Sequence, residues 1–342
     1  MVAEETMQAL VKTARGVGNV ELRRVPVPEA GPGQVRVAVS ATGICGTDMH
    51  IFDDEFATCP PVVMGHEVTG VVDQVGAGAR HNVLGVRVAL ETYASTCGTC
   101  EYCRSGRVNL CGERRSIGSH VNGGFAEYVV VPENNLHKVD ERVVDFAGAL
   151  YEPLACVAQA LCGPSVAAPG DRAVVVGPGA IGLLASQVLR ALGAAVTVVG
   201  GQGDEARLAA ARHLGLAAST SEDLEVPAGG FDVAAECSGS EGGVALALRS
   251  VRKAGHWAQI GLVGRKVSLA LDEAVLKELC LRSANASTPR SWRCAERLVS
   301  SGAVDLNPLV SRAYPIGSWE DAFAYARGRG GVKVVLRPRG DR

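Results

Sequence analysis

The hydrophobic and polar positions divide the chain into two regions with different periodicity. Up to about residue 150, short runs such as VRVAVSATG (35–43) and VTGVVDQVG (68–76) carry alternating β-branched residues between glycines and prolines. A period of two is typical of half-buried strands. Many short strands separated by Gly/Pro turns favour a barrel-like all-β unit.

From about residue 165 the pattern changes to alternating strands and helices. It predicts strands at 173–177, 195–200, 231–239 and 256–264, and helices at 180–193 and 204–215. Strands that alternate with helices indicate a parallel sheet with crossover helices. The periodic α/β pattern ends near residue 290, and the tail closes on a predicted strand, GVKVVLRP (331–338).

A glycine-rich turn follows the first strand of this second region. The run Gly177-Pro178-Gly179-Ala180-Ile181-Gly182 matches G-x-G-x-x-G and opens a helix. In this context the first glycine permits the tight turn, the second lets the backbone approach a pyrophosphate, and the third lets the helix pack on the sheet. The helix N-terminus then offers free N–H groups to the phosphates. The alternative is a plain turn without a ligand. We expect a dinucleotide to contact Gly177, Gly179, Ala180, Ile181 and Gly182.

The residues after the second strand leave the type of nicotinamide cofactor open. Gly200 and Gly201 stand where a ribose-binding carboxylate is expected, and Asp204 suits the N-cap of the next helix. Arg207 is either a ligand for a 2′-phosphate or a solvated helix residue. We predict that NAD is favoured weakly and that NADP is also used. The further cofactor contacts that we expect are Gly200, Arg207, Cys237, Ile260 and Leu262.

Four of the eleven cysteines fall within fifteen residues: Cys97, Cys100, Cys103 and Cys111. Four thiolates so closely spaced can close a tetrahedral site, which suits a structural Zn²⁺. An iron–sulfur centre also uses four cysteines, and two disulfides are the simplest alternative. The spacing, in a chain with an odd number of cysteines, favours zinc.

A second set of metal-binding residue types is dispersed along the chain: Cys45, His66, Glu67 and Glu152. Cys, His and a carboxylate form an incomplete shell that keeps a position free for water or substrate, as catalytic zinc requires. Taken singly, each residue has an ordinary explanation. Cys45 could be a small buried hydrophobe, His66 a core histidine, and Glu152 a residue that precedes a proline turn.

Six motifs together carry a family resemblance. They are GICGTDMH (43–50), GHE (65–67), the four-cysteine lobe, GGFAEY (123–128), EPLA (152–155) and VVVGPGAIG (174–182). From about residue 7 to 338 the chain resembles the zinc-containing medium-chain alcohol dehydrogenases, and within them the sorbitol and threonine dehydrogenase branch. The resemblance implies a GroES-like β-barrel catalytic domain with an inserted Rossmann domain, so the fold class is α/β plus β. The expected domains are 1–160, with the zinc lobe at about 94–114, then 161–289, and a return to the catalytic domain at 290–342.

The resemblance also implies roles for individual residues. Cys45 and His66 match ligands of the catalytic zinc, and Glu67 matches a carboxylate that ligates or backs the metal. Glu152 matches a glutamate that can approach the zinc or exchange onto it. Thr47 and His50 match the hydroxyl and imidazole that relay the substrate proton. We therefore expect two zinc ions per chain, with the structural one on Cys97, Cys100, Cys103 and Cys111.

The expected activity is the reversible oxidation of a secondary alcohol to a ketone, with hydride transfer to NAD(P). The stretch YEPLAC (151–156) favours a polyol, sugar alcohol or cyclitol over threonine. The alternative substrates are L-threonine and amino alcohols. A protein of another class, which binds zinc and dinucleotide without catalysis, would not need the open site that this residue set predicts. A zinc-free quinone reductase would lack the cysteine lobe and GHE.

Charge and hydropathy narrow the expected partners. The formal net charge is −2 without a basic block, so nucleic acid is not expected. No apolar run reaches about 18 residues and the start lacks a signal-peptide pattern, so we expect a cytoplasmic protein without membrane contact. The family resemblance implies a homodimer or homotetramer that acts on a small-molecule alcohol or ketone.

Overall fold

A computed structural model of the chain describes residues 5–144 and 146–339. These residues form two compact units. The first contains the described residues up to Glu152, Val310–Gly328 and those from Lys333 on, and the second contains Pro153–Leu309 and Arg329–Val332. The outer limits of the predicted domains, residues 1 and 342, lie outside the described residues.

β-Strands build the first unit, as the period of two predicts, and their pairing is antiparallel except between the last two strands of the chain. Three strands, β2 (Val20–Pro26), β1 (Thr6–Lys12) and β4 (Val62–Val63), form one sheet. The main sheet has the order β10 (Leu136–Lys138), β6 (Arg87–Leu90), β5 (Glu67–Val75), β3 (Gln34–Gly43), β18 (Lys333–Arg337) and β17 (Val310–Pro315), with β9 (Tyr128–Pro132) also paired to β3. A short pair, β7 (Tyr93–Ser95) with β8 (Arg115–Ser116), lies beside the cysteine lobe in sequence. Alternate residues of β3, Val35, Val37 and Val39, are fully buried in the core between the strands.

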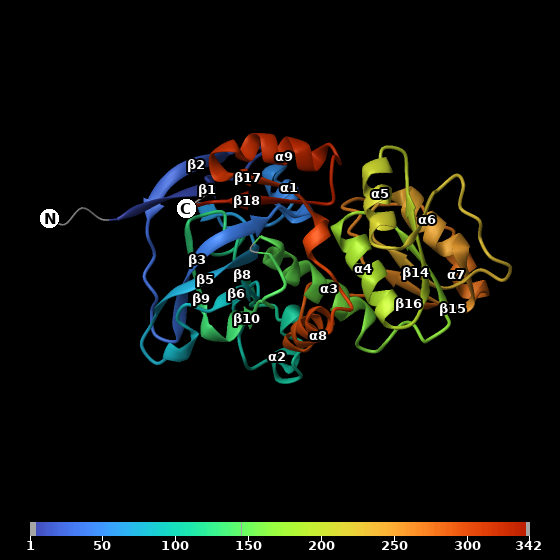
Figure 1. Cartoon of the computed structure of the whole chain (residues 1–342), viewed down its shortest axis with the longest axis horizontal. Coiled ribbons are helices and arrows are strands. Elements are labelled where there is room, and N and C mark those ends of the chain that lie inside the picture. The colour runs from blue at the N-terminus through green and yellow to red at the C-terminus, as the bar shows by residue number, and fades with distance from the viewer. Residues whose placement is uncertain (1–4, 145, 340–342) are drawn as a thin grey trace. The chain divides into compact units, whose positions relative to one another are not determined.

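The end of the chain completes the main sheet of the first unit. Strand β18 pairs antiparallel with β3, with Val335 opposite Gly43, and parallel with β17. Figure 1 shows the red tail lying beside the blue N-terminal strands. The α-helices that the described residues form in this unit are α1 (Gly46–Phe52), α2 (Glu101–Arg104) and α9 (Trp319–Arg327), while α3 (Tyr151–Leu161) begins in it. The predicted GroES-like fold therefore needs residues from both ends of the sequence.

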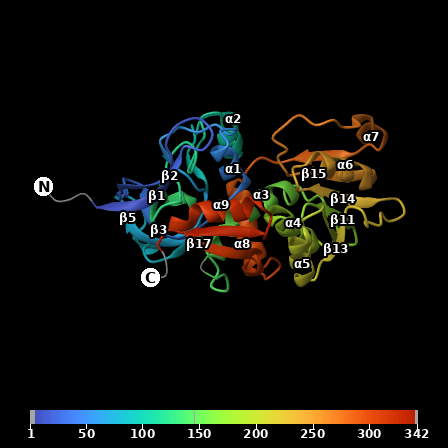
Figure 2. The same cartoon turned by 90° about the horizontal axis from the view of Figure 1, so that it is seen from above.

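The second unit is a doubly wound parallel sheet, which confirms the predicted Rossmann fold. The strand order is β13 (Ala217–Thr220), β12 (Ala195–Gly200), β11 (Arg172–Val176), β14 (Phe231–Glu236), β15 (Val251–Gln259) and β16 (Cys280–Ser283). The helices of this unit are α4 (Ala180–Ala191), α5 (Glu205–His213), α6 (Glu241–Ser250), α7 (Leu271–Leu276) and α8 (Pro289–Ser300). Figure 2 shows α4 and α5 on one face of the sheet and α6 and α7 on the other.

The division into units differs from the predicted domain limits at residues 160 and 290. Helix α8 buries Trp292, Ala295 and Val299, and the segment after it is tied to α4. The side chain of Gln187 donates to the Asp305 carbonyl and accepts from the Asp305 N–H, at 3.1 and 2.8 Å. Because these contacts are tertiary, the loss of periodicity near 290 does not mark the end of the second unit.

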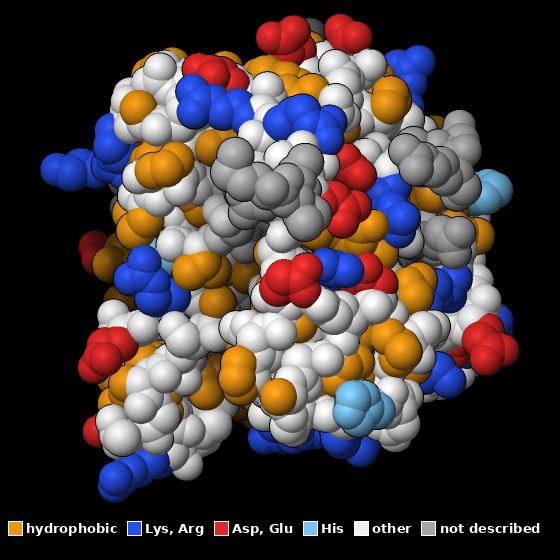
Figure 3. Space-filling view, turned by 90° about the vertical axis from the view of Figure 1, so that its left-hand side faces the viewer, with side chains coloured by type: hydrophobic (Ala, Val, Ile, Leu, Met, Phe, Trp, Pro, Cys, Tyr) orange, Lys and Arg blue, Asp and Glu red, His pale blue; other side chains and the backbone are white. Residues whose placement is uncertain are grey.

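Two surface observations bear on partners. Within the described part of the chain, no helix is long and apolar enough to cross a membrane. Figure 3 shows one face of the molecule, on which Lys/Arg and Asp/Glu side chains are interspersed and do not gather by sign.

Candidate active site

The start of α1 holds the first candidate ligand. Cys45 is the N-cap residue of α1, in extended backbone just before the first turn. Its N–H donates to Asp48 Oδ2 at 2.9 Å, as in a capping box. The side chain of Cys45 therefore projects from a rigid helix start rather than from a flexible loop.

A glycine turn places the next two candidates beside Cys45. Gly65 has φ +87°, and a Cβ there would meet Phe125 at 2.7 Å, so only glycine fits. The turn leads into β5 and brings His66 and Glu67 next to Cys45. One ligand atom from each of Cys45, His66 and Glu67 lies within 4.8 Å of the others. The structure thus brings together three residues that are up to twenty-two positions apart in the sequence.

Glu67 is engaged by a buried lysine that the sequence did not point to. Lys333 Nζ donates to both carboxylate oxygens of Glu67, at 2.8 and 2.6 Å, and to the Ile44 carbonyl at 3.1 Å. Both side chains are almost fully buried. Burial lowers the pKa of Lys333, but the charges of Glu67, Cys45 and Asp48 outweigh it, and the net pKa is raised. Lys333 therefore stays charged and holds Glu67.

His66 lies among acidic groups. Its Nδ1 is 3.8 Å from Asp48 Oδ1. Burial alone lowers the pKa of His66, but Asp48, Cys45 and Glu152 raise it well above its ordinary value. Asp48 is fully buried, and burial raises its own pKa. Its Oδ1 has no hydrogen-bond partner. A buried group of sulfur, imidazole and carboxylates with an unsatisfied oxygen fits a bound cation such as zinc.

Glu152 is the fourth predicted member of this site. It is buried in the first turn of α3. Its charge is one of those that raise the pKa of His66, but Glu152 is not in the group of Cys45, His66 and Glu67 whose ligand atoms lie within 4.8 Å of one another. The site thus offers two carboxylates, of which Glu67 is bound to Lys333.

The two predicted relay residues lie at the start and end of α1. Thr47 Oγ1 is 3.8 Å from Cys45 Sγ, so the hydroxyl borders the cluster. His50, three residues further on, is partly exposed, and its Nδ1 lies 2.7 Å from Glu55 Oε2. Thr47 therefore borders the cluster and His50 is held by Glu55, and among the described residues no hydrogen bond joins Thr47 to His50.

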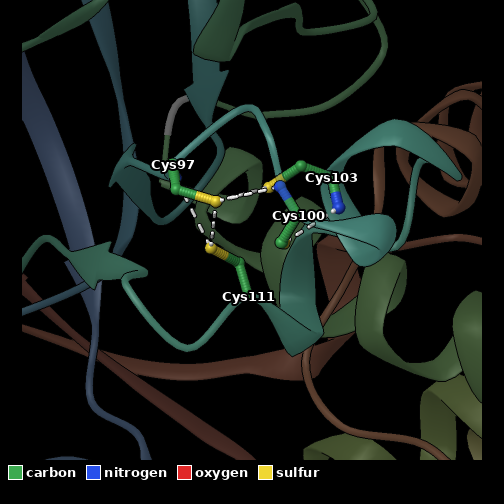
Figure 4. Close-up of side chains that lie close together, drawn as sticks. All are labelled: Cys97, Cys100, Cys103 and Cys111. Carbon is green, nitrogen blue, oxygen red and sulfur yellow. Dashed lines mark hydrogen bonds between the residues drawn. The ribbon is translucent and has the colours of Figure 1, made fainter.

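The four-cysteine lobe is preorganised for one ion. Figure 4 shows the four sulfur-bearing side chains converging from α2 and the flanking turns. Cys97 Sγ is 3.6 Å from Cys111 Sγ and 3.9 Å from Cys103 Sγ. Tetrahedral zinc with Zn–S bonds of about 2.3 Å requires sulfurs about 3.8 Å apart. These distances exclude disulfide bonds, and all eleven cysteines of the chain are free.

Backbone N–H groups in the lobe point at sulfur. Cys100 N–H donates to Cys97 Sγ at 3.3 Å, and Cys103 N–H donates to Cys100 Sγ at 3.4 Å. The N–H groups of Cys100 and Thr99 lower the pKa of Cys97 to about 6. The Cys103 N–H favours the Cys100 thiolate too, but burial and the neighbouring sulfurs raise the pKa of Cys100 to about 11. Four adjacent thiolates therefore need a cation between them.

The glycine-rich turn of the second unit borders a cavity of about 440 Å³. Gly177 has φ +102°, and a Cβ on Gly182 would lie 1.8 Å from the Gly177 carbonyl oxygen. Five predicted contacts line the cavity: Gly177, Gly179, Gly200, Arg207 and Cys237. Three others, Ala180, Ile181 and Gly182, form the first turn of α4. The last two, Ile260 and Leu262, follow β15 and are not among the lining residues, and Leu262 is 76% exposed.

Asp204 and Arg207 behave differently from the sequence interpretation. Asp204 stands at the N-cap of α5, but its side chain makes no capping hydrogen bond and instead accepts from Gly201 N–H at 3.0 Å. Arg207 is not a solvated helix residue. Its Nη1 lies 3.5 Å from Asp204 Oδ1, and its Nε donates to the Gly331 carbonyl at 2.8 Å.

Comparison with known proteins agrees with this geometry. Residues 31–141 match the model of the alcohol dehydrogenase GroES-like domain, and residues 180–301 match that of the zinc-binding dehydrogenases. The chain is 36% identical to a sorbitol dehydrogenase of Halalkalibacterium halodurans over 97% of this chain and 99% of that protein. The chain belongs to the zinc-dependent alcohol dehydrogenases.

Two further proteins that the chain resembles are a threonine dehydrogenase and a zinc-binding dehydrogenase of known structure. An L-threonine 3-dehydrogenase of Saccharopolyspora erythraea is 37% identical, over 96% of this chain and 98% of that protein. The crystal structure of a zinc-binding dehydrogenase from Sinorhizobium meliloti, bound to NADP, matches with a TM-score of 0.87 at 33% identity. That match covers 98% of this chain and 100% of the other.

Sequence reasoning missed three polar residues around the site of this dehydrogenase: Asp48, Glu55 and Lys333. A signal existed for Asp48, because C-x-x-D has the spacing of a capping box. Lys333 carried a weaker signal, as a single charge within the apolar strand VKVVL. Nothing local pointed to Glu55, because its role depends on how the chain turns after α1.

Proposed function

We propose that this dehydrogenase oxidises a secondary hydroxyl of a polyol, sugar alcohol or cyclitol to a ketone, reversibly, with NAD(P) as the hydride acceptor. The observation that carries the proposal is the buried cluster of Cys45, His66 and Glu67, with Glu152 near it and Thr47 at its edge. The sorbitol dehydrogenase relative and a D-arabitol-phosphate dehydrogenase of Enterococcus avium, 34% identical, support a polyol.

The roles of the residues follow from their positions. Cys45, His66 and one carboxylate would hold zinc, which supplies Lewis acidity toward the substrate oxygen when bound. Thr47 accepts the hydroxyl proton by hydrogen bond, and His50 passes it to solvent. Glu55 orients the imidazole through Nδ1, so Nε2 is free to exchange the proton. The carboxylate on the zinc would be Glu67, which Lys333 holds in place, or Glu152.

A substrate panel tests the proposal. Polyols, cyclitols, L-threonine and amino alcohols are offered with NAD⁺ and with NADP⁺, and nicotinamide absorbance is followed. We expect turnover with at least one polyol or cyclitol. Turnover confined to L-threonine or amino alcohols would support the threonine dehydrogenase relatives as the better guide. Absence of turnover with all of them, with intact dinucleotide binding, would favour a silent binding protein.

We also propose two zinc ions per chain, one in each cluster. The supporting observation is that the two groups share no residue and each has its ligand atoms within 4.8 Å. Elemental analysis should give two zinc ions in the unmodified protein and one each in Cys45→Ser and Cys100→Ser. Cys59→Ser, at an exposed cysteine outside both clusters, is the matched control and should retain two. Iron in the lobe would contradict the zinc assignment.

For the cofactor we propose that NAD is used better than NADP by a modest factor. The Gly200–Gly203 segment presents no accessible carboxylate, so repulsion of a 2′-phosphate is weak. The ratio of kcat/KM for the two cofactors measures this. A ratio above about 10³, worth roughly 4 kcal/mol, would reveal a discriminator that these residues do not supply.

For assembly we propose a homodimer or homotetramer that forms through the edge of the second unit's sheet. Strand β16 is the edge strand, and Leu281 on it is 55% exposed. Helix α7, just before it, exposes Leu271, Val275 and Leu276, and edges of this kind are usually covered. Light scattering should give an oligomer, and Leu281→Lys with Val275→Lys should shift it toward monomer.

The free cysteines further support a reducing compartment, and we propose the cytoplasm.

A further inference from the structure

Three arginines line the nucleotide cavity of the second unit: Arg207, Arg249 and Arg329. The cavity is bordered at one end by the phosphate-binding turn and at another by Gly200 and Gly201, where the adenosine ribose is expected. A cation near the ribose decides whether a 2′-phosphate is accepted. The question is which of the three can reach one.

Arg207 is committed to other contacts. Its guanidinium donates to the Gly331 carbonyl at 2.8 Å and faces Asp204 Oδ1 at 3.5 Å. Asp204 in turn accepts from the Gly201 N–H at 3.0 Å. These contacts form a continuous link from the end of β12 to residues 329–332. Arg207 therefore holds residues 329–332 beside the position expected for the ribose. Its guanidinium is already engaged by Asp204 and the Gly331 carbonyl.

Arg329 lies two residues before the carbonyl that Arg207 holds. It adopts a left-handed backbone conformation, φ +55°, and its side chain is exposed. Among the described residues, none forms a hydrogen bond or ion pair with the Arg329 guanidinium. A non-glycine residue with positive φ carries strain that is commonly kept for function. An unpaired guanidinium on a fastened segment is available to a phosphate from the cavity.

The carboxylate nearest to this position does not oppose a phosphate directly. Asp204 Oδ1 is buried, and Asp204 is only 6% exposed. Its charge is also faced by Arg207. Gly200 and Gly201 add no side chain to this part of the lining, where Asp204 is the acidic residue.

We propose that Arg329 contacts the 2′-phosphate of NADP and sets how well NADP is used, and that Arg207 is a positioning residue that holds the Arg329 segment. The inference deepens the proposed function, because it assumes that this cavity takes a nicotinamide dinucleotide. A guanidinium suits this role because it can donate two parallel hydrogen bonds to a phosphate. Arg249, exposed on the last turn of α6, is the competing cation.

Binding of adenosine fragments tests the assignment without catalysis. Calorimetry at fixed ionic strength compares 2′,5′-ADP, which carries the extra phosphate, with 5′-ADP, which lacks it. Arg329→Ala should weaken 2′,5′-ADP tenfold or more and leave 5′-ADP within twofold, while Arg329→Lys should recover part of the loss. Arg249→Ala is the matched control and should leave the ratio of the two affinities unchanged.

The positioning role of Arg207 has its own readout. Arg207→Ala should also weaken 2′,5′-ADP, and combining it with Arg329→Ala should add little, because both changes remove the same contact. If the losses in 2′,5′-ADP affinity of the two single variants simply add in the double variant, Arg207 does not act through Arg329. An unchanged ratio in Arg329→Ala, or a changed ratio in Arg249→Ala, would overturn the assignment of Arg329. If the unmodified protein binds neither fragment, the nucleotide site itself is wrong and the inference fails with it.

Discussion

The two candidate metal sites of this dehydrogenase are built in opposite ways. The lobe takes all four ligands from fifteen consecutive residues, and the N–H groups that stabilise its sulfurs belong to the same turns. The dispersed site takes its residues from α1, β5 and α3, and its counter-charge, Lys333, comes from the last strand. A closed site can be folded locally, whereas an open site needs the whole domain.

The difference extends to charge. In the lobe the donors to the sulfurs are backbone N–H groups and the Thr99 side chain, which carry no formal charge, so a metal would be the partner that balances the charge of the thiolates. At the dispersed site Lys333 already pairs with Glu67, and Asp48 faces His66. At the dispersed site the chain itself therefore balances part of the negative charge. Losing the lobe should damage the fold, and losing the dispersed site should damage the chemistry.

The largest effect is expected at the dispersed site. Cys45→Ser or His66→Ala should abolish turnover with every active substrate, because each removes a proposed ligand of the zinc that would polarise the substrate. Dinucleotide binding should be unchanged, since the Gly177–Gly182 turn lies in the other unit. Steady-state kinetics and a cofactor titration measure the two properties. Unchanged turnover would remove the catalytic assignment.

A substitution in the four-cysteine lobe should reduce stability and leave catalysis unchanged. Cys100→Ser should lower the thermal midpoint and the yield of folded protein, while the correctly folded fraction keeps its kcat. A structural zinc contributes on the order of 10 kcal/mol to folding in small isolated modules, and the effect should be smaller in this larger domain. A variant of full stability but no activity would show that the two roles are reversed.

The buried ion pair should matter mainly for stability. Lys333→Met leaves the Glu67 carboxylate buried without its partner, and breaking a buried pair costs about 3–5 kcal/mol. The double variant Lys333→Met/Glu67→Gln should regain part of the loss, because the orphaned charge is removed as well. Thermal unfolding of the metal-loaded proteins compares them. Equal midpoints for the unmodified protein and Lys333→Met would mean that the pair contributes nothing.

The relay should have a smaller effect that is confined to rate. His50→Ala should reduce kcat by roughly 10²-fold near neutral pH, the usual scale for a general acid–base group. External imidazole should restore part of it. Glu55→Gln keeps the ring in place with a weaker hydrogen bond and should cost less than His50→Ala. A loss in Glu55→Gln larger than that in His50→Ala would place the proton path elsewhere.

The sequence predicted the features that depend on neighbouring residues better than those that depend on contacts between distant residues. Local patterns were sufficient for β12, whose limits of 195–200 were predicted residue for residue, and for the lobe. The end of the second unit was not predictable from periodicity. It depends on Gln187 binding Asp305, a contact across 118 residues. The surroundings of Arg207 could not be predicted either, because its side chain binds a distant partner, the Gly331 carbonyl.

The cluster of Cys45, His66 and Glu67 lies between these cases. Cys45 and His66 could be named only through the family resemblance, because neither residue alone indicates a ligand. Lys333 was missed because a lysine in a strand usually lies on its exposed face, whereas here the strand enters the centre of a sheet beside β3. What the sequence cannot supply is the set of charges that surround each ligand, since these come from elements far apart in the chain.

The smallest effect is expected from the carboxylate behind His66. Asp48→Asn keeps an oxygen that can accept from the Cys45 N–H, so the start of α1 should be preserved. It removes the negative charge 3.8 Å from His66 Nδ1. Outer-shell changes of this kind typically cost 10–100-fold in metal affinity or activity. Competition with a coloured chelator should therefore show weaker zinc at the dispersed site and unchanged zinc at the lobe. Saturating zinc should return most of the activity, because the ligands themselves remain.

Asp73→Asn, at a carboxylate on the far end of β5 paired with Arg36, is the control and should change neither site. An equal loss from both sites would mean that Asp48 supports the fold of the whole unit rather than the imidazole.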